Sequence, residues 1–233
     1  MPKYIEQLVS EQLRRTELAA RARAEEAPLA EGVSPVITIS RQLGSGGRKI
    51  AERLVSVLEW SLWDKELVNA IARNASVRRQ IVESFDERTI SEIELLTRSI
   101  MGEHDLGGFL YYRHLARAVM SIGRLGNAII LGRGANFLLK DALNVRIHAS
   151  LERRIENLMR FEGWTRQRAE QAIRRSDRER SVFTKRMYGE DAADCSHYDL
   201  VVKTDELDIE GAVRTILTAL RFKFPTVKLP PAG

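Results

Sequence analysis

Cysteine is almost missing from this chain of 233 residues, with Cys195 as its single representative. One thiol forms neither an internal disulfide nor a cysteine-based zinc site, which excludes a disulfide-stapled scaffold and favours a reducing, cytoplasmic setting. The four histidines are scattered without ligand spacing, so we expect no metal held by a protein cage. Apolar runs are short as well, and none approaches the roughly 20 residues that cross a bilayer. We therefore expect no membrane segment.

Aromatic residues are also scarce, at 6% of the chain, and the excess of positive charge is small, with 37 Lys and Arg against 32 Asp and Glu. A net charge of +5 favours an anionic partner without choosing between nucleic acid and a phosphorylated small molecule. Because few aromatic side chains are present for base stacking, nucleic-acid binding is the weaker alternative. The hydrophobic content of 44% suffices for a folded core.

Five short apolar runs alternate with helical patterns along the main part of the chain. Runs that are short and β-branched, each followed by a helix, predict an α/β fold with a parallel sheet covered by helices on both faces. The expected domain spans residues 36–222, with a helical insert at 65–124 that is interrupted at Gly102, Gly107 and Gly108, and residues 223–233 form a frayed tail. The predicted strands are residues 36–40, 61–63, 128–131, 144–148 and 200–202.

The first 30 residues are rich in Leu, Ala, Glu and Arg, with apolar residues near helical spacing. This pattern predicts an N-terminal helical arm over residues 1–30, followed by a linker at 31–35 that ends at Pro35. Two roles stay open for the arm. It either packs on its own domain or pairs with a second copy in a homodimer.

A glycine-rich turn follows the first predicted strand. Gly44, Ser45, Gly46 and Gly47 lie between that strand and a helix, where backbone N–H groups and the helix dipole can cradle a phosphate. Glycine is needed there because the ligand approaches the backbone closely. The alternative is that these glycines serve tight packing alone.

The turn departs from the standard phosphate-binding loop, G-x-x-x-x-G-K-[ST]. In that register the first glycine is replaced by Arg41, the lysine by Gly47, and the magnesium-binding hydroxyl by Arg48 or Lys49. Arg41, Arg48 and Lys49 are therefore the candidates for the missing cation. We favour Arg41, because it precedes the turn and a guanidinium grips phosphate oxygens in a fork.

The chain contains five distinctive stretches, at residues 39–51, 63–67, 130–136, 174–180 and 197–204. In this order they resemble the cytidylate kinase-like family of P-loop proteins. The resemblance implies a P-loop NTPase-type sheet of five parallel strands, a helical acceptor-binding insert and an arginine-rich lid at about 174–190. It runs from Val36 to Leu220 and leaves the first 30 residues uncovered.

The resemblance also implies roles for particular residues. It makes Arg133 a clamp on the phosphate of the acceptor, Arg174 and Arg180 lid clamps on the transferring phosphates, and Asp177 the residue that orients them. From its place after a strand, Asp64 either positions the acceptor or a magnesium-bound water, or simply caps the next helix. Lys and Arg are dense at residues 174–186, called the basic block below, and we expect the helix that starts near Thr165 to end inside it. For Arg133 and the basic block the plain alternative is a solvated surface.

These features together predict an ATP-dependent, magnesium-assisted phosphotransferase acting on a nucleoside monophosphate or a similar small anionic acceptor. The acceptor stays open, because Gly134 stands where cytidylate kinases carry an aspartate used in reading the base. A second hypothesis is a nucleotide-binding regulatory or scaffold protein that kept the fold and lost turnover. The missing loop lysine and hydroxyl support it.

Overall fold

The structure is a computed structural model. It describes residues 4, 7–16, 35–73, 90, 91, 93–95, 97, 109–225 and 227, with side chains for all of them except 109 and 110. Most of the expected linker at 31–35, the glycines expected to interrupt the insert, and most of the tail beyond residue 225 lie outside the described residues.

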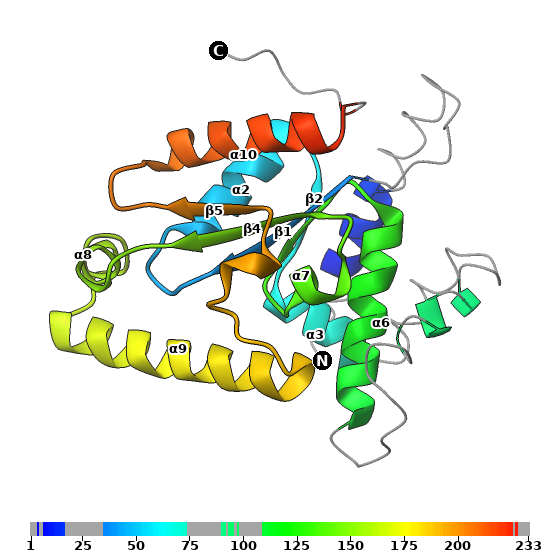
Figure 1. Cartoon of the computed structure of the whole chain (residues 1–233), viewed down its shortest axis with the longest axis horizontal. Helices are drawn as coiled ribbons and strands as arrows, with labels where there is room; N and C mark the ends of the chain where they lie inside the picture. The colour runs from blue at the N-terminus through cyan, green and yellow to red at the C-terminus, as the bar shows by residue number, and fades with distance from the viewer. Residues whose placement is uncertain are drawn as a thin grey trace.

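A five-stranded parallel sheet forms the centre of the molecule, with strand order β2-β3-β1-β4-β5 (Figure 1). This confirms the predicted α/β class, and each predicted strand forms within one residue of its expected limits. The strands are β1 (Val36–Arg41), β2 (Ser61–Trp63), β3 (Ala128–Leu131), β4 (Leu143–His148) and β5 (Leu200–Lys203).

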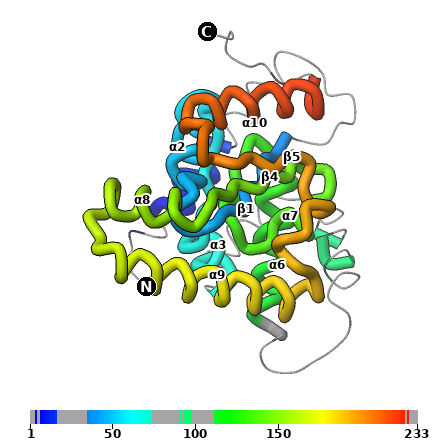
Figure 2. The backbone as a smooth tube through the Cα atoms, turned by 60° about the vertical axis from the view of Figure 1, so that its left-hand side comes forward, coloured from blue at the N-terminus to red at the C-terminus, as the bar shows by residue number. Residues whose placement is uncertain are grey.

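Helices cover both faces of the sheet (Figure 1). On one face lie α2 (Gly47–Leu58) and α10 (Ile209–Lys223), and on the other lie α3 (Lys65–Arg73), α6 (Phe109–Leu125) and the short α7 (Ala135–Leu138). The pair α8 (Leu151–Glu162) and α9 (Arg166–Tyr188) projects beyond the end of the sheet, as Figure 2 shows. A short 3-10 helix, η1 (Cys195–His197), precedes β5.

Alternating side chains of the central strand supply both halves of the core. Ile37 and Ile39 of β1 pack with Leu54 of α2 and with α10, whereas Val36 faces the cluster built by α3 and α6. Thr38 also faces that second side, and its buried hydroxyl donates to Asn144 Oδ1 at 2.6 Å. Strands covered on both faces carry this continuous apolar sequence, which is why short runs sufficed to predict them.

The extent of α9 differs from the prediction. We expected the helical pattern to end inside the basic block, but the helix continues through it for 23 residues and stops at Gly189, which adopts a left-handed conformation. Its sequence contains neither Gly nor Pro, and Thr165 caps its N-terminus. Arginine is a good helix former, and pairs such as Arg166 with Glu170 support the exposed face.

The carboxyl ends of all five strands meet at one edge of the sheet because the strands are parallel. Strand β1 connects to β2 on one side of the sheet, whereas its neighbour β4 connects to β5 on the other side, so the chain direction reverses between them. Open α/β sheets bind ligands at such a switch point. The glycine turn after β1, the Gly132–Gly134 turn after β3 and the turn after β5 all lie there.

The described N-terminal residues 7–16 are helical and pack against their own domain. Val9 and Leu13 are buried in the cluster that contains α3 and α6. The outermost strand, β2, donates its Leu62 N–H to Gln12 Oε1 at 3.0 Å, and Thr16 donates to the Ser61 hydroxyl at 3.1 Å. This segment therefore covers part of an edge strand that would otherwise expose its backbone.

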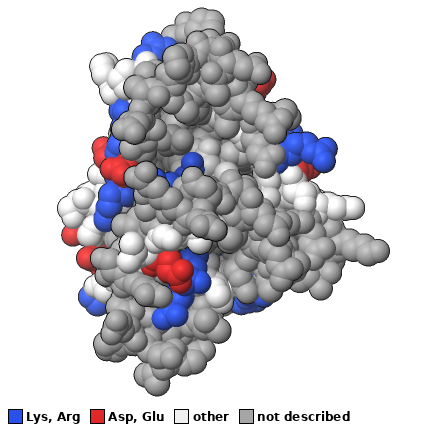
Figure 3. All heavy atoms as spheres, turned by 90° about the vertical axis from the view of Figure 1, so that its right-hand side faces the viewer, with Lys and Arg blue, Asp and Glu red and all other residues white. Residues whose placement is uncertain are grey.

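Two surface properties follow from the described residues. No helix among them is long and apolar enough to span a bilayer. On the face shown in Figure 3, the described Lys and Arg side chains stand beside Asp and Glu side chains, without a continuous basic patch among the residues described there.

We predict that Val9→Ala lowers the free energy of unfolding by about 1–3 kcal/mol, because the side chain is fully buried and its loss leaves a small cavity. Urea unfolding measures the change. Arg15→Ala is the control on the same helix, since its exposed pair with Glu11 contributes at most about 0.5 kcal/mol. If Val9→Ala and the control had the same free energy of unfolding, this helix would not pack on the domain in solution.

Candidate active site

The glycine turn adopts a conformation that requires glycine, for two different reasons. Gly44 and Gly46 have φ values of 84° and 79°, in the left-handed region. A Cβ on Gly44 would come within 2.5 Å of the Arg154 carbonyl oxygen, and one on Gly47 within 2.6 Å of the Arg41 Cβ. A Cβ on Gly46 would meet nothing within 4 Å. Gly44 and Gly47 thus serve packing, whereas Gly46 leaves open space.

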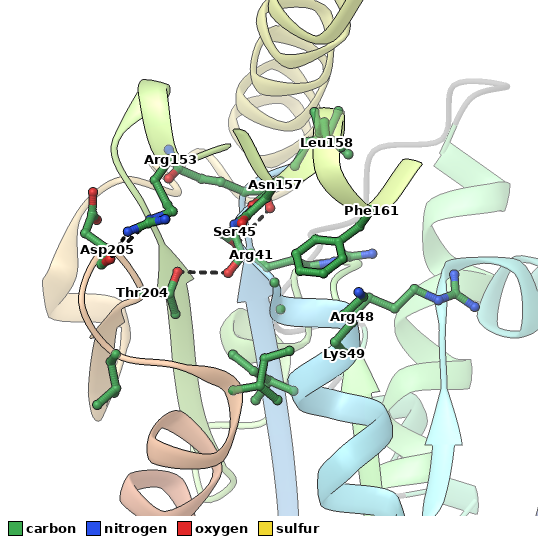
Figure 4. Close-up of a pocket in the computed structure, with 18 of the residues that line it drawn as sticks. Arg41, Ser45, Arg48, Lys49, Arg153, Asn157, Leu158, Phe161, Thr204 and Asp205 are labelled. Atoms are coloured by element: carbon green, nitrogen blue, oxygen red, sulfur yellow. Dashed lines mark hydrogen bonds between the residues drawn. The ribbon is translucent and has the colours of Figure 1, made fainter. Parts of the chain in front are cut away.

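That open space belongs to a cavity of about 640 Å³, shown in Figure 4 and called the donor cavity below. The turn and the first residues of α2 form one wall, α8 forms another, and residues 204–210 close it. The first turn of α2 contains no acidic residue, and no side chain caps its N-terminus. Its backbone N–H groups therefore remain available for an anion, which the helix dipole also favours.

The framework holds the turn through its carbonyl groups. Thr204 donates to the Ser45 carbonyl at 2.9 Å, and Asn157 Nδ2 donates to the Gly44 carbonyl at 2.8 Å (Figure 4). The Ser45 hydroxyl is fully buried and donates to the Gln42 carbonyl at 2.9 Å. Ser45 therefore stabilises the turn through its hydroxyl, which faces away from the cavity.

Arg154, a buried residue of α8, links the turn to α9. Its Nε donates to the Leu43 carbonyl at 2.7 Å, and its two terminal nitrogens donate to the Asp177 carboxylate at 2.9 and 2.7 Å. We expected Asp177 to orient lid arginines, but its direct partner is Arg154. Arg154 is not among the site residues predicted from the sequence. Its one local sign is that a charged residue stands beside Ile155 and Leu158, which face inward from α8.

Three arginines converge where the strands end. Burial, followed by the nearby charges of Arg180 and Arg133, lowers the pKa of Arg41 to about 10, and Glu66 opposes this shift. Burial is also the largest cause that lowers the pKa of Arg180. The Arg180 Nη1 and the Arg133 Nε are buried without a hydrogen-bond partner in the described structure. Such crowded, unsatisfied cations are suited to bind an anion.

A second cavity of about 450 Å³, called the acceptor cavity below, lies beside the first. Arg41, Gln42 and Arg180 line both cavities. The acceptor cavity also contains Arg133 and the neighbouring glycines, and three aromatic side chains contribute to its lining, namely Phe137, Phe183 and Tyr198. Two cavities with a shared basic wall can bring two anionic ligands together.

Arg133 is held in an unusual conformation at the edge of the acceptor cavity. Its φ of 60° is left-handed, which few residues other than glycine adopt. Its carbonyl accepts from Tyr188 Oη at 2.8 Å, its Nη1 donates to Asn69 Oδ1 at 3.3 Å, and its guanidinium stacks 4.7 Å above the Phe183 ring. A strained residue with so many restraints is typical of a functional position.

The other two candidates for the missing loop cation, Arg48 and Lys49, contact neighbouring side chains. Arg48 pairs with Glu52 at 3.0 Å and with Asp64 Oδ2 at 3.5 Å. Lys49 Nζ lies 3.4 Å above the ring of Phe161. Both residues line the donor cavity, but of the three candidates only Arg41 also reaches the acceptor cavity.

Asp64 and Arg174 lie outside the described lining of both cavities. Asp64 Oδ1 accepts from the backbone N–H groups of Glu66 and Leu67, both at 3.1 Å, so Asp64 caps α3. Its second oxygen faces Arg48, close to the first turn of α2. Arg174 is exposed on α9.

Metal ligands are sparse at the site. Within the described ranges, no group of three or more His, Cys, Asp or Glu side chains is arranged to hold a metal ion. A Mg²⁺ ion that arrives on nucleotide phosphates needs only one or two protein carboxylates and keeps several waters. Asp64 Oδ2 fits that requirement, because its partner Arg48 is exposed and displaceable.

Comparisons with known proteins bear on the family and the fold. The model of the cytidylate kinase-like family matches residues 36–206. A cytidylate kinase from Ignicoccus hospitalis is 27% identical over 184 residues, 78% of this chain and 96% of that protein. One from Methanocaldococcus jannaschii is 31% identical over 110 residues, 45% of this chain and 61% of that protein. The crystal structure of an uncharacterized protein from Eubacterium ventriosum shares the fold, with a TM-score of 0.55 at 20% identity, covering 79% and 97% of the two chains.

We predict that Gly44→Ala destabilises the nucleotide-free protein by about 1–3 kcal/mol more than Gly46→Ala, as measured by urea unfolding. Both substitutions place a methyl group on a left-handed backbone, which costs about 1–2 kcal/mol. At Gly44 alone the methyl group also collides with the Arg154 carbonyl. Similar losses for the two variants would contradict the close packing of the turn on α8.

Proposed function

Because the chain belongs to the cytidylate kinase-like family, we propose that it transfers the γ-phosphate of ATP to a nucleoside monophosphate or a similar small anionic acceptor. The observation that supports this most directly is the wall that the donor and acceptor cavities share. Arg41 and Arg180 line both, so a phosphoryl group passing from one cavity to the other would remain in contact with them. The catalytic unit in this proposal is the segment 36–222.

Phosphoryl transfer depends on positioning and charge stabilisation, and the protein supplies no covalent nucleophile. In this proposal the backbone N–H groups of the Gly44–Gly47 turn hold the donor phosphates, and Arg133 binds the phosphate of the acceptor. Arg41 and Arg180 neutralise the charge on the transferring phosphoryl group. Electrostatic stabilisation by a preorganised site is usually the largest single contribution to catalysis. Arg41 then fulfils the role that a lysine has in the standard loop.

The helix α9 would act as the lid. Its Arg180 extends into both cavities, while Asp177 of the same face is fixed by Arg154 beneath the turn. The lid is thereby set relative to the phosphate-binding turn before any ligand arrives. Arginines on such a lid exclude water from the transferring group as well as stabilising it.

Asp64 would hold a Mg²⁺ ion carried by ATP. When bound, the ion neutralises charge on the phosphates. Asp64 lies at the start of α3 and faces Arg48 of α2, next to the turn that would carry those phosphates. The carboxylate would keep its capping role at the same time, because only its Oδ1 accepts the backbone N–H groups.

The alternative of a nucleotide-binding regulatory or scaffold protein has specific support. Gly47 stands where the loop lysine is expected, and the one hydroxyl in the turn, that of Ser45, faces inward. A protein of this kind would bind ATP in the donor cavity and release no ADP in response to an acceptor. Turnover therefore separates the two proposals.

The first test is ADP formation from Mg-ATP across a panel of nucleoside monophosphates. We expect turnover with at least one acceptor, and Arg180→Ala should lower it about 100-fold or more while ATP still binds. Arg178→Ala is the matched control, because Arg178 is exposed on the same helix and should stay within about twofold. ATP binding without acceptor-dependent ADP release in the wild type would establish the regulatory alternative instead.

A second test separates the two roles of Asp64. Asn is as good a helix cap as Asp, so Asp64→Asn should leave urea unfolding unchanged within about 0.5 kcal/mol. It should lower turnover about tenfold and raise the Mg²⁺ concentration needed for half-maximal rate, because the carboxylate charge is lost. An unchanged magnesium dependence would leave Asp64 as a helix cap only.

A further inference from the structure

Asn136 is a buried amide that the proposed catalytic scheme does not use. Its exposed fraction is 3%, and it lines the acceptor cavity. Its Nδ2 is buried and has no hydrogen-bond partner in the described structure. Buried amide groups are almost always paired, because leaving one without a partner is unfavourable. An unpaired donor beside a cavity therefore points to a ligand.

The surroundings of Asn136 hold it in a fixed position. The neighbouring residues Ala135 and Leu138 are buried in the core. Phe137 stacks on the Tyr188 ring with centroids 4.9 Å apart, and it meets the His197 ring edge-on at the same distance. A side chain carried by so well-anchored a segment is preorganised, so it can discriminate between ligands at little entropic cost.

The acceptor cavity offers a second kind of recognition besides its positive charge. Arg41, Arg133 and Arg180 supply positive charge, and Arg41 and Arg180 do so on the wall shared with the donor cavity. Phe137, Phe183 and Tyr198 contribute aromatic surface, which favours a flat ring over a flexible chain. The volume of about 450 Å³ lies within the usual range for small-molecule sites.

We propose that Asn136 determines acceptor specificity by donating a hydrogen bond from Nδ2 to a carbonyl oxygen or ring nitrogen of a nucleobase, while the arginines hold the phosphate of the same molecule. This inference rests on the proposed function and deepens it. The acceptor is then a nucleoside monophosphate rather than a sugar phosphate, and its base is read at Asn136, two residues beyond Gly134.

The test uses the full-length protein and Asn136→Leu, which keeps the branched shape and removes the amide. The kinetic constants are measured with ATP and a panel of CMP, UMP, AMP and GMP, and ribose 5-phosphate serves as a competitive inhibitor that has the phosphate but no base. We expect the KM of the preferred nucleotide to rise about tenfold, with the KM of ATP and the inhibition by ribose 5-phosphate unchanged.

The control is the same substitution at a paired amide, Asn157→Leu. Asn157 Nδ2 donates to the Gly44 carbonyl beside the donor cavity. This variant should raise the KM of ATP, lower stability and leave the KM of the nucleotide acceptor unchanged. If Asn136→Leu instead unfolds more easily and raises the KM of ATP and of the acceptor together, Asn136 has a structural role and the inference is wrong. If Asn136→Leu prefers the same nucleotide of the panel to the same degree as the wild type, the inference is also wrong. Turnover of any acceptor would still support the proposed function.

Should the wild type turn over no acceptor, equilibrium binding of the same nucleotides and of ribose 5-phosphate decides the question. Tighter binding of one nucleotide than of ribose 5-phosphate, lost in Asn136→Leu, supports base recognition in a protein without transferase activity. Equal binding of nucleotide and sugar phosphate, or no binding of either, overturns it.

Discussion

The bidentate pair between Arg154 and Asp177 is the interaction on which the geometry of the site depends. One buried guanidinium joins the Leu43 carbonyl, the helix α8 and the lid helix α9. The backbone of the same residue packs against Gly44, which tolerates no side chain there. Arg154 is buried, whereas the Asp177 side chain is 39% exposed, so removing Asp177 should cost less than the about 3–5 kcal/mol of a fully buried pair. The turn and the lid are therefore held as one unit.

Charge is distributed unevenly across this unit. Arg154 is paired with Asp177, whereas the pKa of Arg41 is lowered first by burial and then by the charge of Arg180. The fold thus maintains mutual repulsion at the strand ends, and a bound anion would relieve it. The small overall charge of +5 does not reveal this local crowding, because a net charge carries no information on where the charged side chains lie.

Local sequence patterns were sufficient to predict the sheet. Its strands are buried on both faces, so apolar β-branched runs mark them, and the glycine turn is marked by its position between a strand and a helix. The position of Arg154 could not be predicted in this way, because its partners lie 111 and 23 residues away in sequence. The length of α9 was missed because a dense charge block suggests a solvated break, whereas arginine favours a helix. The roles of the predicted site residues stay predictions, although the structure brings Arg41, Arg133 and Arg180 together.

The wall shared by the two cavities has a pharmacological consequence. Arg41, Gln42 and Arg180 separate spaces of about 640 and 450 Å³ without closing one from the other. A single molecule with a nucleoside at each end of a phosphate chain would occupy both spaces at once. Its second half would bind at the high effective concentration that a short tether creates, so its affinity would exceed that of either half by orders of magnitude. Under the proposed function, a bisubstrate inhibitor is thus the kind of compound that this site should bind most tightly.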